Sequence, residues 1–100
     1  MVNNVNIDIT DVNTEVTFHS GSGTSTETDK YLNIGYLCKK VHIANDKAFV
    51  IVAVNGTDFT NPKSVSAGVG FSLKTHAFET ISSIKIRTTT TSSHFEVMMW

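Results

Sequence analysis

Hydrophobic and polar residues alternate one by one along most of this chain, and this pattern limits its fold more than any other feature. In the stretch "VNIDIT", Val5, Ile7 and Ile9 share one face of an extended strand. In "TISSIKIRT", Ile84 and Ile86 do the same. Alternation of period two places one face of a strand on a core and the other in water. No stretch has a helical period, and 19 valines and isoleucines outnumber 3 leucines. The sequence therefore predicts an all-β protein.

About eight short strands follow one another at close spacing. They are expected over residues 5–10, 12–18, 31–37, 39–43, 48–54, 70–74, 80–88 and 94–100. Residues 20–29 and 55–64 are expected to be loops. Val12, Val16 and Phe18 are expected to point inward, and Tyr36 is expected to share one face of its strand with Leu32 and Ile34. The four residues "ANDK" predict a hairpin between 39–43 and 48–54. This pattern predicts one domain over residues 1–100, an antiparallel β-sandwich or flattened barrel of about eight strands.

Composition argues against several classes of protein. Charged residues make up 17% of the chain and the net charge is −1, so no basic field for nucleic acid is expected. The longest apolar run, "AFVIVAV", is too short to cross a bilayer as a helix. The opening "MVNNVNIDIT" has no basic and apolar signal-peptide pattern, so secretion by a signal peptide is not expected. The single cysteine, Cys38, allows no internal disulfide and is expected to be a small buried hydrophobic residue.

No residue pattern points to catalysis, a cofactor or a metal. Four histidines are scattered along the chain: His19, His42, His76 and His94. Cys38 and His42 would lie about 13 Å apart on a strand, too far for one metal ion. Gly68 and Gly70 lack the third glycine and the βαβ context of a dinucleotide site, so they are expected to be turn residues. We therefore expect no enzyme activity, no cofactor and no metal.

Two strands are apolar on both faces, which a lone 100-residue sandwich does not require. Val50, Val52 and Val54 share the second face of "AFVIVAV". In "HFEVMMW", Met98 and Trp100 are expected to point outward once alternate residues have filled the core. Either a strongly coiled sheet or a folded-over loop covers these five residues, or another chain does. The second interpretation also explains a closing tryptophan, because termini usually fray and a tryptophan there usually needs covering.

The glycine- and serine-rich stretch after residue 20 is a second candidate for contact. Its first residues are Gly21, Ser22, Gly23 and Thr24, and no hydrophobic residue occurs in the loop. Long loops without regular structure in compact domains are often functional. The N-terminal stretch "VNNVNIDIT" is a further candidate, as a strand that pairs with the open sheet edge of a neighbouring copy.

The second half of the chain resembles small β-sandwich accessory proteins of tailed bacteriophages, a group that includes capsid decoration (cement) proteins. The resemblance rests on a valine-rich strand, the step "SAGVGFSL", the strand "ISSIKIR", a Thr/Ser hairpin and a closing strand with an aromatic end. It implies a structural role in a virion and no catalysis. It carries over no functional residue.

The resulting expectation is a non-enzymatic structural protein of a phage-like virion, in many copies, as a capsid decoration protein or at another position such as neck or tail. Its expected partners are further copies of itself, the major capsid protein or another virion protein, with no nucleic acid and no membrane. It would be made in the host cytoplasm. The alternative is a carbohydrate-binding module or adhesin-type receptor-binding domain, because Tyr31, Tyr36, Trp100 and many asparagines are available to bind sugar. A small oligomerising regulator is a third class.

Overall fold

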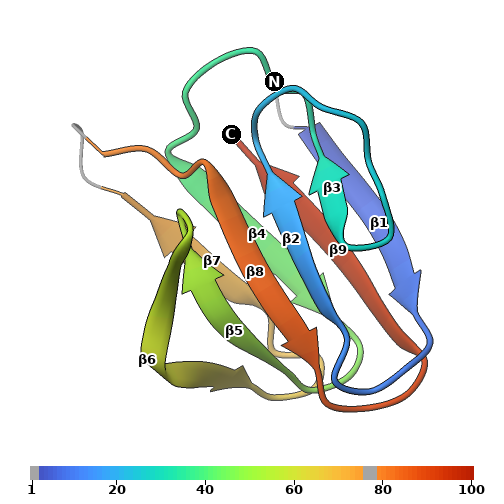
Figure 1. Cartoon of the computed structure of the whole chain (residues 1–100). Helices are drawn as coiled ribbons and strands as arrows, with labels where there is room; N and C mark the ends of the chain where they lie inside the picture. The colour runs from blue at the N-terminus through green and yellow to red at the C-terminus, as the bar shows by residue number, and fades with distance from the viewer. Residues whose placement is uncertain (1–2, 76–78) are drawn as a thin grey trace.

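Nine β-strands make up the regular structure of the part of the chain that the structure describes (Figure 1). The computed structural model describes residues 3–75 and 79–100, so His76 and the start of the N-terminal stretch lie outside the described residues. The strands are β1 (Asn3–Ile9), β2 (Glu15–His19), β3 (Asp29–Tyr31), β4 (Lys40–Asn45), β5 (Phe49–Val54), β6 (Thr57–Val65), β7 (Phe71–Lys74), β8 (Ser83–Thr88) and β9 (Ser93–Met99). The prediction of an all-β sandwich is confirmed.

The strands form two sheets whose order is that of a jelly roll. One sheet has four strands in the order β1-β9-β4-β7, and the other has five in the order β3-β2-β8-β5-β6. Without the short β3, which pairs parallel to β2, eight strands remain and all their pairings are antiparallel. Neighbours in the sequence mostly lie in opposite sheets, which is the wrapping that defines this fold. The five-stranded sheet faces the viewer in Figure 1.

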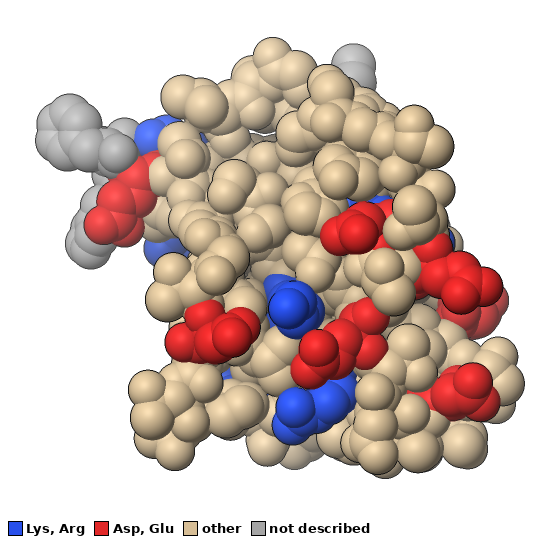
Figure 2. Space-filling model, in the orientation of Figure 1, with Lys and Arg blue, Asp and Glu red and all other residues tan. Residues whose placement is uncertain are grey.

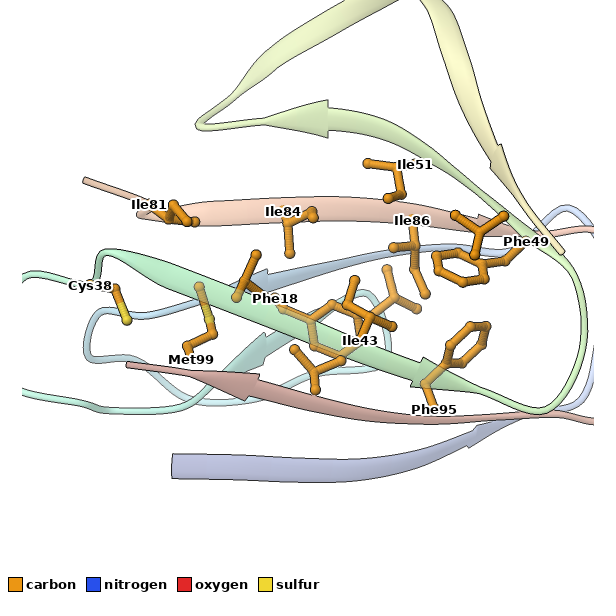
Figure 3. Close-up of a cluster of buried hydrophobic side chains, with 14 of the residues drawn as sticks. Phe18, Cys38, Ile43, Phe49, Ile51, Ile81, Ile84, Ile86, Phe95 and Met99 are labelled. Carbon is orange, nitrogen blue, oxygen red and sulfur yellow. The ribbon is translucent and has the colours of Figure 1, made fainter. Parts of the chain in front are cut away.

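Alternate residues of both sheets meet in a filled core (Figure 3). Phe18, Ile84 and Ile86 come from the five-stranded sheet, and all three side chains are fully buried. The rings of Phe49 and Phe95 meet edge to face across the sandwich, with centroids 5.1 Å apart. Edge-to-face pairs stabilise a core beyond the area they bury. The interior of this sandwich is therefore occupied by its own side chains.

The predicted hairpin across "ANDK" is wrong. β4 pairs with β9 and β7, whereas β5 pairs with β8 and β6 in the other sheet. The connection turns the chain from one sheet to the other. Local spacing cannot distinguish this crossing from a hairpin, because both need a short polar connection between two apolar runs.

A strand occupies much of the stretch that was expected to be a loop. β6 forms a hairpin with β5 through a two-residue turn, Asn55 and Gly56, both with positive φ (54° and 78°). Its residues are exposed as far as Ser64, so no alternation marked it. Pro62 fits because β6 is an edge strand, where one row of backbone N–H groups has no ladder partner.

Two further residues do not lie where the alternation placed them. Val12 is 44% exposed, although it was expected to point inward, and Tyr36 is 47% exposed, although it was expected to share a face with Ile34, which is buried. Val12 precedes Asn13, whose φ is 55°, and Tyr36 follows Gly35, whose φ is 79°. Positive φ values break an extended strand, so residues 32–39 form a loop in place of the expected strand.

Candidate functional site on the outer face of the four-stranded sheet

The five apolar residues expected to form an interface do not lie together. Val50 and Val52 belong to β5 in the five-stranded sheet, whereas Met98 and Trp100 lie on or just after β9 in the four-stranded sheet. Outward residues of the two sheets point to opposite sides of a sandwich. The five residues therefore do not share one surface.

The chain itself covers most of the β5 side. Val50 and Val52 are each only 7% exposed. Val52 lines a small hollow. Phe59 and Pro62 of β6 and Lys85 and Arg87 of β8 also contribute to its lining. The apolar face of β5 could be covered by the chain itself or by another chain. For Val50 and Val52, the chain itself covers it.

Val54 points into the core, because a β-bulge reverses the alternation of β5. Before the bulge, Ile51 lies opposite the buried Ile86; after it, Val54 lies opposite the buried Ile84. The pairing register shifts between Ile51 and Ala53. One extra residue on a strand moves every later side chain to the other face.

Met98 and Trp100 do point away from the core. Their neighbours Val97 and Met99 are fully buried, and Met98 and Trp100 themselves are half-buried. Cross-strand pairing places four rows of side chains around them on one side of the sheet, which we call the outer face. From one end to the other the rows are Asp8 and His94; Asn6, Glu96 and Ala44; Asn4, Met98, His42 and Ser72; and Trp100, Lys40 and Lys74.

Trp100 is held firmly at one end of the outer face. Its backbone N–H donates to the carbonyl of Lys40, and its carbonyl accepts from the N–H groups of Lys39 and Lys40, all at 2.9–3.0 Å. The Lys40 ammonium lies 4.7 Å from the centre of the indole ring. A cation over an indole face is stabilising. The closing residue therefore continues the pairing of β9 with β4, with its ring on the outer face.

The opposite end of the outer face carries acidic groups, which we call the acidic end: Asp8, Asp46 and Glu96. Nδ1 of His94 lies 2.7 Å from a carboxylate oxygen of Asp8. The backbone N–H of His94 donates to Asp46 at 2.7 Å, and this bond lowers the pKa of the Asp46 carboxyl. The side-chain amide of Asn4 donates to Glu96 at 3.3 Å.

A hollow lies at the acidic end. Its volume is about 280 Å³, and the small residue Ala44 leaves room there on β4. The lining residues are Asn6, Ala44, Asn45, Asp46, His94 and Glu96. The outer face thus has a half-buried aromatic ring near one end and a recess near the other.

The loop expected as a second contact candidate is exposed but anchored. Residues 21–28 are all exposed. The N–H of Gly23 donates to the Asn33 side chain at 3.0 Å, and the N–H of Tyr31 donates to Ser25 Oγ at 3.0 Å. The ring of Tyr31 lies so close to Gly23 that an added Cβ would come within 2.5 Å of it. Contact through Gly21, Ser22, Gly23 and Thr24 stays a prediction.

Beside this loop lies a second hollow of about 360 Å³, which we call the end hollow. His19, Ser20, Tyr31, Tyr36 and Leu37 contribute to its lining. The rings of His19 and Tyr31 stack 4.4 Å apart, and His19 Nε2 lies 2.8 Å from Asp29. Leu37 is 75% exposed, so an apolar side chain stands at the rim.

Cys38 and the other potential metal ligands show no arrangement that points to a reactive or metal-binding site in the part of the chain that the structure describes. Cys38 is buried, as expected, and burial raises the pKa of its thiol. It lies in the loop before β4, where a strand was expected. Within residues 3–75 and 79–100, no group of three His, Cys, Asp or Glu side chains is placed to hold a metal ion. In the same ranges no helix is long and apolar enough to cross a membrane.

Comparisons with known proteins agree on the fold and go no further. No family model matches the chain, and no curated protein matches its sequence. A solution NMR structure of a de novo designed double-stranded beta-helix matches with a TM-score of 0.52, covering 100% of this chain and 99% of that one. The two sequences are 13% identical, so the likeness concerns the fold alone.

Proposed function

We propose that the chain is a non-enzymatic structural protein of a phage-like virion, a decoration protein that binds in many copies through the outer face of its four-stranded sheet. The observation that carries the proposal is the position of Met98 and Trp100. Met98 lies on β9, a middle strand of the four-stranded sheet, and Trp100 directly follows it, held by three backbone hydrogen bonds to β4 and the residue before it. Aromatic anchors on rigid elements are typical of protein contact surfaces.

The energetics favour adhesion by many weak contacts. Covering the exposed parts of one tryptophan and one methionine contributes only a few kcal/mol at about 25 cal/mol per Å². Many copies bound side by side multiply such contacts, because each further contact is made at high effective concentration. The charges on the five-stranded side are few and of both signs, which leaves no strong field to repel neighbouring copies (Figure 2).

Particles purified from the cells that encode the chain test this proposal. We expect the chain to sediment with full particles in a density gradient, at a copy number comparable to that of the capsid subunit. A recombinant wild-type chain should rebind to particles from which the native chain has been removed. The double variant Met98→Ser, Trp100→Ser should not rebind.

Ser64→Ala, on the exposed edge strand β6, is the matched control and should rebind like the wild type. Circular dichroism is used to check that both variants are folded. If the chain stays in the soluble fraction, apart from all particles, the proposal is wrong.

A carbohydrate-binding module is the second candidate, and the end hollow favours it. Tyr31 and Tyr36, two of the residues considered for sugar binding, line the same hollow, whereas Trp100 lies on the outer face. Tyr31 is enclosed between His19 and Gly23, so stacking on a sugar would use Tyr36. A glycan array with the wild type, Tyr36→Ala and Trp100→Ser tests this candidate. Binding that only Tyr36→Ala removes would support it, and no binding by the wild type would exclude it.

A further inference from the structure

The outer face is polarised in both charge and shape. Lys40, Lys74 and Trp100 lie at one end, and the acidic end lies at the other. Asp46 and Glu96 border the hollow over Ala44. One surface thus presents an outward aromatic ring beside positive charge and a recess beside negative charge.

The two features lie symmetrically about the row that contains Met98 and His42. Trp100 and Lys40 are two residues from this row in one direction, and Glu96 and Ala44 are two residues from it in the other. Two residues of a strand span about 7 Å, so Trp100 and Ala44, at the near edge of the recess, each lie about 7 Å from the same line. Consider a two-fold axis that runs along this row, across the strands and in the plane of contact. It places the row of Trp100 and Lys40 of one copy opposite the row of Glu96 and Ala44 of the other copy.

We infer that two copies of the chain pack outer face to outer face about this axis. The row of Trp100 and Lys40 in each copy then lies opposite the row of Glu96 and Ala44 in the second copy, so that Trp100 meets the hollow and the Lys40 ammonium lies within reach of Glu96. The contact is isologous, since the same patch serves both subunits. This inference rests on the proposed function, because it takes the outer face as the binding surface and names a second copy as its first occupant.

Charge complementarity favours a second copy in this orientation. In the alternative two-fold arrangement, the strands of the two copies run parallel. Lys40 and Lys74 of one copy would then lie close to Lys40 and Lys74 of the other copy. Like charges opposed across an interface are costly, whereas the antiparallel arrangement pairs each lysine end with an acidic end. Lys40 and Glu96 lie four residues apart along the strand register, about 13 Å, so they form no pair within one copy.

The size of the face predicts a weak dimer. Four strands about 4.8 Å apart and seven residues at about 3.4 Å give roughly 450 Å² per copy. Two such faces bury about 900 Å², below the 1,200 Å² or so of ordinary stable complexes. We therefore expect a dissociation constant in the micromolar range or above. Dimers then form mainly where many copies are brought together at high local concentration.

Sedimentation velocity of the purified chain, over about 5 μM to 1 mM, measures this association. We expect a concentration-dependent monomer–dimer equilibrium. Trp100→Ser removes the aromatic ring, Ala44→Leu fills the recess, and each should weaken the dimer at least about tenfold. Ala44 points outward on β4, so the leucine adds no volume to the core.

Charge reversal decides the orientation. Lys40→Glu alone and Glu96→Lys alone should each abolish the dimer, because each variant opposes like charges twice. An equimolar mixture of the two variants should restore it, because both contacts are then attractive. Asp58→Lys and Lys63→Glu, on the exposed edge strand β6, are the matched controls and should dimerise like the wild type, alone or mixed.

A wild-type chain that is monomeric at the highest concentration overturns the inference. So does a dimer that Trp100→Ser and Ala44→Leu leave unchanged, or single charge variants that the mixture does not rescue. Rebinding to particles is measured separately. A monomer that still rebinds through Met98 and Trp100 contradicts the two-fold contact alone, whereas a dimer that binds no particle contradicts the proposed function.

Discussion

Polar side chains in this protein act mainly as fixed structural partners for the backbone of loops. The buried Asn45 donates to the carbonyls of Lys47 and Ser66 and accepts from the N–H of Gly70. The Asn55 side chain accepts from the N–H of Ser82 at 2.7 Å. Side chains of this kind replace the hydrogen bonds that a sheet would supply. Asparagines engaged in this way are not available to a sugar.

Replacing Asn45 by alanine should destabilise the protein by about 2–3 kcal/mol, because three buried or half-buried backbone groups lose their partner. Urea unfolding followed by circular dichroism measures the loss. Asn6→Ala is the control, since Asn6 is exposed on β1. A loss at Asn45 no larger than that at Asn6 would contradict this role.

The carboxyl of Asp46 should titrate below its ordinary range, because the His94 N–H binds its charged form. A folded-state pKa below the unfolded value stabilises the protein above the unfolded pKa. That contribution is lost as the pH falls through the folded value. NMR detection of the carboxyl carbon gives the pKa, and Asp46→Asn should remove this part of the acid dependence. An ordinary pKa at Asp46 would show that the hydrogen bond does not persist in solution.

At the scale of the strand, alternation in the sequence predicted which side chains pack into the core. Val16, Phe18, Ile84, Ile86, Phe95, Val97 and Met99 were all expected inside and are all buried. β6 could not be found in this way, because an edge strand exposed along most of its length has no reason to alternate. The Asn55–Gly56 pair does signal a two-residue hairpin, and that signal was interpreted only as a turn. The bulge in β5, which turns Val54 inward, left no mark in the sequence.

The Asn55–Gly56 turn offers a test of the β5–β6 hairpin. Gly56→Ala should cost about 1 kcal/mol, because φ is 78° there and an L-residue is strained in that region. Gly21→Ala is the control: an added Cβ meets nothing within 4 Å at either glycine, and Gly21 has no positive φ. Thermal unfolding of both variants gives the difference. Equal stability would mean that the turn is not strained by alanine.

At the scale of the molecule, the order of strands could not be read from the sequence. A sandwich followed from alternation, but the jelly roll depends on pairings between distant segments, such as β1 with β9 and β2 with β8. The candidate site depends on the same pairings. The outer face combines residues near both ends of the chain, Asn4 and Met98 among them, with His42 from the middle. Periodicity identified Met98 and Trp100 as outward, but it could not supply their neighbours.

The edge-to-face pair that joins the two sheets near one end of the core should contribute strongly to the stability of the sandwich (Figure 3). Phe95→Ala should cost about 3–5 kcal/mol, since the ring is fully buried against Phe49. Phe59→Ala is the matched control, because that ring is 39% exposed on β6, and it should cost about 1 kcal/mol. Denaturant midpoints compare the two. Similar losses would mean that the two sheets do not meet through these rings.

Hydroxyl-radical footprinting of Met98 and Trp100 tests the central claim, that the outer face of the four-stranded sheet is the binding surface. The chain is compared free at low concentration and bound to particles, with Tyr36 and Leu37 of the end hollow as internal references. Both Met98 and Trp100 are half-buried when the chain is free, so they should react and should become protected on binding. Unchanged oxidation of Met98 and Trp100, together with protection of Tyr36 and Leu37, would place the binding surface at the end hollow and contradict the account.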